Sequence, residues 1–113
     1  SYQSDSRMSN ETKLLRHVVL FKFKENTPTS SVQAIETGFR ALALELDIVR
    51  SFEWGINNSP EGLSQGFTHC FFLTFASEED RNAYLPHPAH QEFVQLLRPH
   101  IEKALVLDYW AHE

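Results

Sequence analysis

Two stretches of the chain are apolar on both of their alternating faces and are predicted to be buried strands. In residues 15–24 the odd positions include His17 and Phe21, and the even positions include Val18 and Leu20. Successive side chains of a strand point to opposite faces of its sheet, so an apolar start on both faces favours a central strand. Residues 67–75 repeat the pattern, with these odd positions: Phe67, His69, Phe71, Leu73 and Phe75.

The segment between these strands is predicted to contain a helix and then a further strand, the second in chain order. After Pro28, apolar residues recur at every third or fourth position: Val32, Ile35, Phe39, Leu42 and Leu46. This spacing is typical of an amphipathic helix with one buried stripe. Residues 49–57 alternate loosely between apolar and polar and are predicted to form a strand, followed by a loop through Gly62.

The C-terminal part is predicted to contain two helices and a final strand. Ser77 suits an N-cap and acids follow it, so a short helix is expected to about Leu85. Pro88 suits the first position of the next helix, and Pro99 should kink or end it. Residues 105–110 are predicted to be the last strand. Four positions of the second helix would share one face, which should point at the sheet: His90, Val94, Leu97 and Ile101.

The β-α-β-β-α-β order predicts an α+β fold, ferredoxin-like with an antiparallel sheet. Right-handed crossovers would place the first and third strands side by side in the middle of the sheet. Helices can cover only one face, and the other face carries Val18, Leu20, Cys70 and Phe72. A second copy of the sheet is the simplest cover, so we expect a homodimer that forms a dimeric α/β barrel.

Composition and charge limit the possible partners. The 113-residue chain has a net charge of −5 and scattered basic residues, so a nucleic acid partner is not expected. No apolar run approaches the roughly 18 residues of a membrane span, and the N-terminus lacks the apolar core of a signal peptide. The single cysteine, Cys70, is expected to be a buried small hydrophobe, so we expect a cytoplasmic protein. Residues 1–13 are expected to be a disordered or artificially added segment, and residues 14–113 to be the domain.

Several short motifs together resemble one protein family. They are Arg16-His17-Val18-Val19-Leu20-Phe21, Trp54-Gly55, Gly66-Phe67-Thr68-His69, His87-Pro88-Ala89-His90 and Leu107-Asp108-Tyr109. In combination they resemble the stress-responsive dimeric α/β-barrel (Dabb) family over residues 15–111. That family includes plant heat-stable proteins of unclear activity and a polyketide cyclase, olivetolic acid cyclase.

The resemblance implies a set of site residues. By position in the motifs, His90 resembles the base of the cyclase-like members and Tyr84 resembles its assisting tyrosine. His17 and His69 match two further histidines of that pocket. The chain departs from the cyclase at two positions, where it has Phe39 in place of a tyrosine and Arg50 in place of a lysine, and the lost hydroxyl puts the same substrate and reaction in doubt.

The residues themselves allow a functional interpretation of this group. If the helices cover the odd face, all three histidines point into one layer. An imidazole suits removal of a proton α to a carbonyl, and Tyr84 would donate to the developing enolate oxygen. His17 and His69 would orient the substrate, although in antiparallel strands they converge only if the register is offset. Alternatively, each histidine is a core or capping residue whose hydrogen bonds are satisfied.

A metal site is a further alternative interpretation. His87 and His90 are three residues apart and share a helical face, but His87 is better placed to cap the helix that begins at Pro88. No cysteine or carboxylate ligand accompanies them in the sequence, and no glycine-rich phosphate loop is present. We therefore expect no metal and no cofactor.

Three functions remain open from the sequence. The first is a stress-response protein that binds a small apolar or carbonyl ligand in a pocket lined by histidine and tyrosine. The second is a cofactor-free cyclase or lyase that uses His90 as general base and Tyr84 as donor, or a monooxygenase-like relative. The third is a purely structural, stress-stable dimer.

Overall fold

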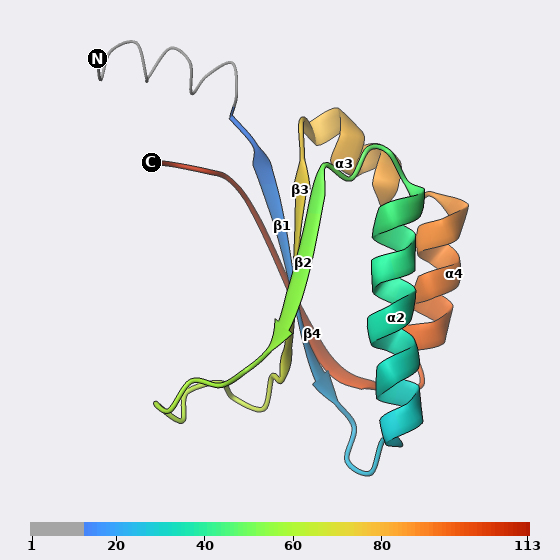
Figure 1. The fold of residues 1–113 in the computed structure, drawn as a ribbon, viewed down its shortest axis with the longest axis vertical. Helices are drawn as coiled ribbons and strands as arrows, with labels where there is room; N and C mark the ends of the chain where they lie inside the picture. Colours follow the sequence, from blue (N-terminus) through green and yellow to red (C-terminus); the bar gives the residue numbers. More distant parts are fainter. Residues whose placement is uncertain (1–12) are drawn as a thin grey trace.

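The computed structural model describes residues 13–113 and has the predicted ferredoxin-like α+β fold (Figure 1). Its sheet has four antiparallel strands in the order β2-β3-β1-β4. The predictions for residues 1–12 lie outside the described residues. The elements in chain order are β1 (Leu15–Phe23), α2 (Thr29–Glu45), β2 (Ser51–Ile56), β3 (His69–Phe75), α3 (Glu78–Tyr84), α4 (Pro88–Leu97) and β4 (Ile101–Trp110).

The two strands predicted to be central, β1 and β3, are the middle strands of the sheet. In β1 the odd positions from Leu15 to Phe21 are buried and the even positions between them are half-buried. Leu73 lies opposite His17, and His69 lies opposite Phe21. Directly opposed residues share a face, so the odd positions of both strands line one side of the sheet.

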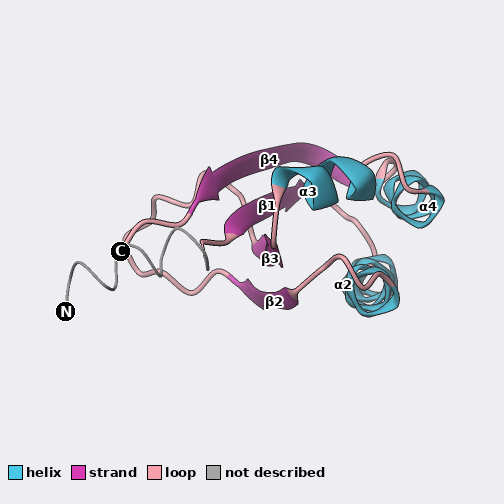
Figure 2. Ribbon diagram, turned by 90° about the horizontal axis from the view of Figure 1, so that it is seen from above, coloured by secondary structure: helices cyan, strands magenta, loops and turns pink. Residues whose placement is uncertain are grey.

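All three helices lie on that odd side, as the view from above shows (Figure 2). The hydroxyl of Ser77 accepts a hydrogen bond from the backbone N–H of Asp80, and the Nδ1 atom of His87 accepts one from Ala89. Each side chain therefore caps the helix that follows it, as the sequence predicts. Because Nδ1 of His87 accepts this bond, that nitrogen is already occupied by helix α4.

The end of α4 differs from the prediction for Ile101. Helix α4 stops at Leu97, before Pro99, and Ile101 is the first residue of β4 and not part of the helical face. Strand β4 therefore begins four residues before the predicted start. It can extend because β1 continues to pair with it past an irregularity between Lys22 and Phe23.

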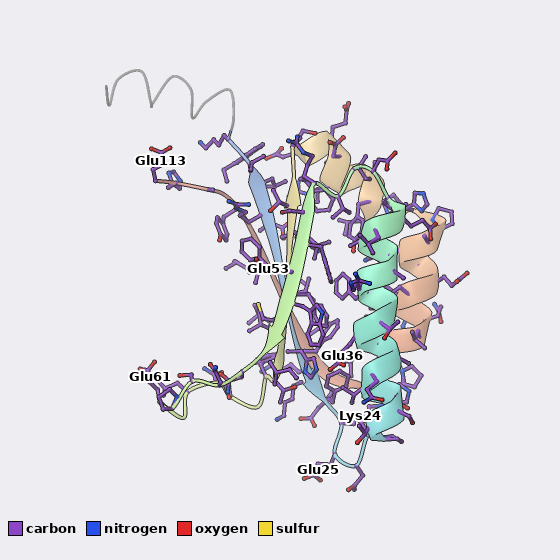
Figure 3. The ribbon with its side chains drawn as sticks, in the orientation of Figure 1. Lys24, Glu25, Glu36, Glu53, Glu61 and Glu113 are labelled. Carbon is purple, nitrogen blue, oxygen red and sulfur yellow. The ribbon has the colours of Figure 1, made fainter. Side chains whose placement is uncertain are left out.

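The core between sheet and helices is rich in aromatic rings, and the opposite face of the sheet is apolar but uncovered by any described helix. Figure 3 shows Glu36 on the helix side and Glu53 on the uncovered side. Three large hydrophobic residues of β4 are exposed on this open face, opposite Leu20, Val18 and Arg16 of β1: Leu105, Leu107 and Tyr109. No helix within residues 13–113 is long and apolar enough to cross a membrane.

Candidate functional site

Three of the predicted site residues meet at one end of the layer between sheet and helices. The ring of Tyr84, at the end of α3, lies 4.6 Å from the ring of His90 on α4 and 5.9 Å from the ring of His17 on β1, measured between centroids. Phe75 packs against Tyr84 at 5.2 Å and against His17 at 6.0 Å. The structure thus brings His17 beside Tyr84 and His90, which lie far from it in the sequence.

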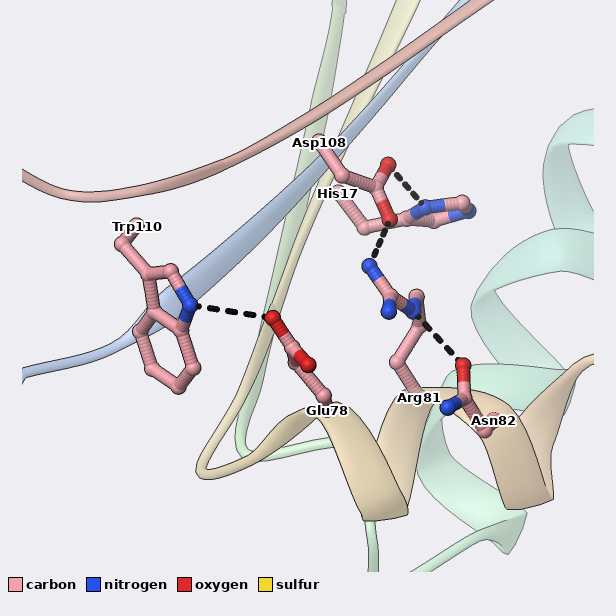
Figure 4. Close-up of polar contacts among 6 residues, drawn as sticks. All are labelled: His17, Glu78, Arg81, Asn82, Asp108 and Trp110. Carbon is pink, nitrogen blue, oxygen red and sulfur yellow. Dashed lines mark hydrogen bonds and ion pairs between the residues drawn. The ribbon is translucent and has the colours of Figure 1, made fainter.

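His17 is held by a carboxylate from the neighbouring strand (Figure 4). Its Nδ1 atom lies 2.7 Å from Oδ1 of Asp108, and Nη1 of Arg81 lies 3.1 Å from Oδ2 of the same carboxylate. A carboxylate between these partners accepts, so Nδ1 of His17 donates. This bond fixes the orientation of the imidazole, as an aspartate does in a catalytic triad.

The hydroxyl of Tyr84 is buried and has no hydrogen-bond partner among the described residues. The side chain is 0% exposed, and burial raises the pKa of its phenol far above the ordinary value. Burial disfavours the charged phenolate, so the hydroxyl stays protonated and able to donate. Tyr84 is therefore a neutral hydrogen-bond donor that lacks an acceptor.

His90 is half-buried and forms a hydrogen bond with the segment between α3 and α4. Its Nδ1 atom lies 2.9 Å from the carbonyl oxygen of Leu85. A carbonyl can only accept, so Nδ1 carries the proton and a neutral ring keeps its lone pair on Nε2. The pKa of His90 is lowered mainly by burial, with a small further contribution from His17, while the bond to Leu85 opposes this shift. The lowered pKa favours the neutral ring, which can act as a base.

His69 lies at the opposite end of the layer, and both of its ring nitrogens already have partners. Nε2 lies 2.7 Å from Oε2 of Glu36 on α2, and Nδ1 lies 2.8 Å from the hydroxyl of Thr68. The ring also stacks parallel to Trp54 at 5.9 Å. The β1–β3 register separates His69 from His17 by four residues along the strand, which is about 13 Å at roughly 3.3 Å per residue. The two histidines therefore do not converge.

Phe39 and Arg50, the two positions that depart from the cyclase, occupy different surroundings. Phe39 is buried in the middle of the layer, stacked on Phe71 with the ring centroids 4.5 Å apart. Arg50 is exposed just before β2, where its backbone N–H donates to the carbonyl of Thr74. Neither residue contacts Tyr84 or His90 through any ring or hydrogen-bond contact of the described chain.

Two cavities of the structure lie away from Tyr84. One, of about 530 Å³, lies on the open face of the sheet beside Leu20 and Cys70, under the loop that follows β2. The other, of about 630 Å³, is a groove between α2 and α4 that includes Gly38 and Leu96. Within residues 13–113, no group of three or more histidine, cysteine, aspartate or glutamate side chains is arranged to hold a metal ion.

Comparison with known proteins agrees with the fold. Residues 15–111 match the family described as the Stress responsive A/B Barrel Domain, or Dabb. The chain belongs to the Dabb family. Over 95 residues it is 36% identical to the stress-response A/B barrel domain-containing protein HS1 of Arabidopsis thaliana, covering 84% of this chain and 87% of HS1. It is 27% identical to olivetolic acid cyclase of Cannabis sativa, over 84% of this chain and 94% of that enzyme.

Two solved structures are similar to this chain over almost their whole length. A hydroxynitrile lyase from Passiflora edulis superposes with a TM-score of 0.84 at 27% identity, covering 90% of this chain and 96% of the lyase. A protein of unknown function from a Jannaschia species, described as dimeric and ferredoxin-like, superposes with a TM-score of 0.74 at 25% identity. That match covers 85% of this chain and 97% of the other. Proteins similar to this chain thus include enzymes of different activity.

Sequence reasoning assigned no site role to three polar residues of this Dabb domain: Arg81, Asp108 and Glu36. Asp108 carried a detectable signal, because aspartate is uncommon within a strand and this one lies in a segment that otherwise favours β structure. The pairing of Arg81 with Asp108, and of Glu36 with His69, depends on which segments the fold places side by side. No spacing in the sequence indicates either pair.

Proposed function

We propose that this Dabb-family chain binds a small carbonyl compound beside Tyr84. The observation that supports this most directly is the buried hydroxyl without a partner. Buried polar side chains nearly always form a hydrogen bond, and leaving one unpaired costs about 1–3 kcal/mol. The carbonyl oxygen of a ligand would supply the acceptor that the described residues do not.

His90 would make the second contact with this ligand. Its Nδ1 proton is committed to the carbonyl of Leu85, and the lone pair of Nε2 is therefore available to accept. A carbonyl compound with an enol or hydroxyl group matches a neutral donor on one side and a neutral acceptor on the other. Ligands without a hydrogen-bond donor, such as simple ethers, offer no partner for Nε2 of His90 and should bind less tightly.

Access to Tyr84 requires movement of the corner between α3 and α4. Tyr84 is fully buried and neither described cavity reaches it, whereas Leu85 is 39% exposed. Displacement of the Leu85 side chain alone would open this corner and leave in place the bonds that its backbone carbonyl accepts from His90 and Gln91. A local opening of this kind favours a small ligand.

The binding proposal is tested by calorimetric titration with acetylacetone, a short β-diketone. Tyr84→Phe removes only the hydroxyl and should weaken binding about five- to tenfold, since a hydrogen bond contributes roughly 1–1.5 kcal/mol. Tyr109→Phe removes a hydroxyl on the open face of the sheet and serves as the matched control. Absence of binding, or equal affinities of wild type and Tyr84→Phe, would contradict the proposal and leave the purely structural role.

A second candidate function is cofactor-free proton transfer, of the lyase or cyclase type. The neutral base His90 beside the neutral donor Tyr84 favours it, because the base can remove a proton α to a carbonyl while the phenol stabilises the enolate oxygen. The relatives named olivetolic acid cyclase and hydroxynitrile lyase support an enzyme of this general class. Replacement of the α-hydrogens of acetone by solvent deuterium, followed by NMR, tests it. The wild type should accelerate the exchange and His90→Asn should not, whereas equal rates would exclude this role for His90.

The assembly that we propose is a homodimer through the open face of the sheet. This face exposes apolar side chains of β4 and half-buried ones of β1 and β3, which is unfavourable in water. A second copy covers it by a two-fold interface of identical surfaces. The Jannaschia protein, which has the same fold, is described as dimeric. Sedimentation at twice the mass of one chain is the expected result.

A further inference from the structure

Aromatic rings fill the middle of the layer between the sheet and the helices. Phe39 of α2 stacks on Phe71 of β3 at 4.5 Å and packs on Phe93 of α4 at 4.7 Å between ring centroids. Phe52 and Phe21 extend the group, each within 6.3 Å of Phe39. These separations lie within the range of direct aromatic contact, so the rings leave no room for a ligand between them.

This group lies between the two polar ends of the layer. His17 is opposite Leu73 at one end, and His69 is opposite Phe21 at the other. Phe71 lies between Leu73 and His69 on the same face of β3, and Phe93 is one helical turn beyond His90 on α4. A ligand that touched both Tyr84 and His69 would therefore have to displace buried phenylalanine rings.

The far end of the layer also offers no free polar group to a long ligand. Both ring nitrogens of His69 are engaged, by Glu36 and by Thr68, and Trp54 covers one of its faces. A ligand group could bind His69 only by breaking one of these hydrogen bonds. Elongation of a ligand from Tyr84 towards His69 is thus opposed both by packing and by polar partners.

We infer that Phe39, through its stack with Phe71 and Phe93, is a specificity-determining residue that restricts the Tyr84–His90 site to short carbonyl compounds. The inference rests on the proposed function of that site and adds its substrate class. Aldehydes, ketones and β-diketones of a few carbon atoms belong to this class, and extended poly-β-keto chains are excluded. Phe39 acts because, among the rings of residues 13–113, it alone contacts both Phe71 of the sheet and Phe93 of α4 at less than 5 Å.

The experiment compares two β-diketones of different length, acetylacetone and the elongated dibenzoylmethane, by calorimetric titration. The wild type should bind acetylacetone and not dibenzoylmethane. Phe39→Ala should bind dibenzoylmethane at least about tenfold more tightly than the wild type, because it opens space along the layer. Ile35→Ala removes another fully buried side chain of the same helix outside the stack and is the matched control, which should not gain this binding.

The outcomes separate this inference from the proposed function. Wild-type affinity for dibenzoylmethane equal to that of Phe39→Ala, or an equal gain in Ile35→Ala, overturns the inference while acetylacetone binding preserves the function. Wild type that binds neither compound contradicts the proposed function. If the wild type binds neither compound but Phe39→Ala binds dibenzoylmethane, the result still supports closure of the layer by Phe39. If Phe39→Ala does not bind dibenzoylmethane either, the inference about Phe39 is overturned as well. If Phe39→Ala does not fold, Phe39→Leu creates a smaller space and carries the same comparison, with a correspondingly smaller gain.

Discussion

The Nδ1 atom of His17 on β1 lies 2.7 Å from Oδ1 of Asp108 on β4. His17 is buried, and the other oxygen of Asp108 binds Arg81 of α3 at 3.1 Å. One carboxylate therefore links two strands and a helix and orients the imidazole that packs against Tyr84. We expect this link to matter both for stability and for the site.

Loss of the Asp108 carboxylate should destabilise the fold. Asp108→Ala leaves His17 and Arg81 without their acceptor, and breaking a largely buried pair of this kind costs about 2–4 kcal/mol. Urea unfolding at one fixed protein concentration measures the change, since dimer formation makes stability depend on concentration. Glu102→Ala is the control, because the pair of Glu102 with Lys22 is exposed and should contribute under about 1 kcal/mol. Equal losses in the two variants would contradict the prediction.

Tyr84→Phe should keep or increase stability although it removes a ligand contact. The hydroxyl is buried without a partner, so its removal eliminates an uncompensated desolvation cost and leaves the ring packing on Phe75 and His90. The gain should be about 1 kcal/mol in the absence of ligand. A thermal or urea denaturation curve measures it. A clear loss of stability would mean that the hydroxyl has a partner in solution.

His90 should make the protein less stable at acidic pH. Burial lowers the pKa of His90 in the folded state below its ordinary value of 6.5, so the unfolded chain takes up this proton first as the pH falls. The contribution is fully present above about pH 6.5 and is lost as the pH falls through the folded-state pKa. His90→Asn places an amide donor near the position of Nδ1 but cannot titrate. Between about pH 7 and pH 5, the free energy of unfolding should therefore fall more in the wild type than in His90→Asn. An equal fall in both proteins would refute this role.

Gly66 should not tolerate a side chain. Its φ of +86° lies in the region that favours glycine, and a Cβ there would lie 2.7 Å from Cε of Lys22. The lysine can move, so we attribute most of the expected loss of about 1–2 kcal/mol in Gly66→Ala to the backbone. Gly55→Ala is the control, since an added Cβ there meets nothing within 4 Å. Similar denaturation midpoints for the two variants would contradict this assignment.

A charge on the open face of the sheet should split the dimer. Leu107 is 58% exposed and lies opposite Val18. The Leu107→Asp chain should therefore still fold, but it should sediment as a monomer. Leu20→Asp tests the centre of the same face. Leu44→Asp introduces the same charge at a residue of α2 that is 68% exposed, and it should remain a dimer. A wild type that sediments as a monomer at micromolar concentration would exclude the dimer altogether.

The sequence predicts the elements of this fold because their hydrophobic periods are clear. The odd set of β1, the apolar stripe of α2 through Phe39, and the caps Ser77 and His87 all lie where the pattern places them. The start of β4 could not be predicted in this way, since Ile101 fits a helical stripe as well as a strand. Pairing with β1 decides its structure, and pairing is not a local property of the chain.

The sequence alone determines that His17 and His69 lie at odd positions of their strands and that His90 shares a helical face with Val94 and Leu97, because strand alternation and helical spacing fix these faces. The tertiary structure decides that the helices cover the odd face of the sheet (Figure 2). Only the tertiary structure decides which of the three histidines meet. The antiparallel register separates His69 from His17, and the packing of α2 on the sheet places Glu36 beside His69. The α3–α4 corner brings Tyr84 and His90 beside His17. Register and helix packing depend on contacts between residues far apart in the chain, and a local sequence pattern does not predict those contacts.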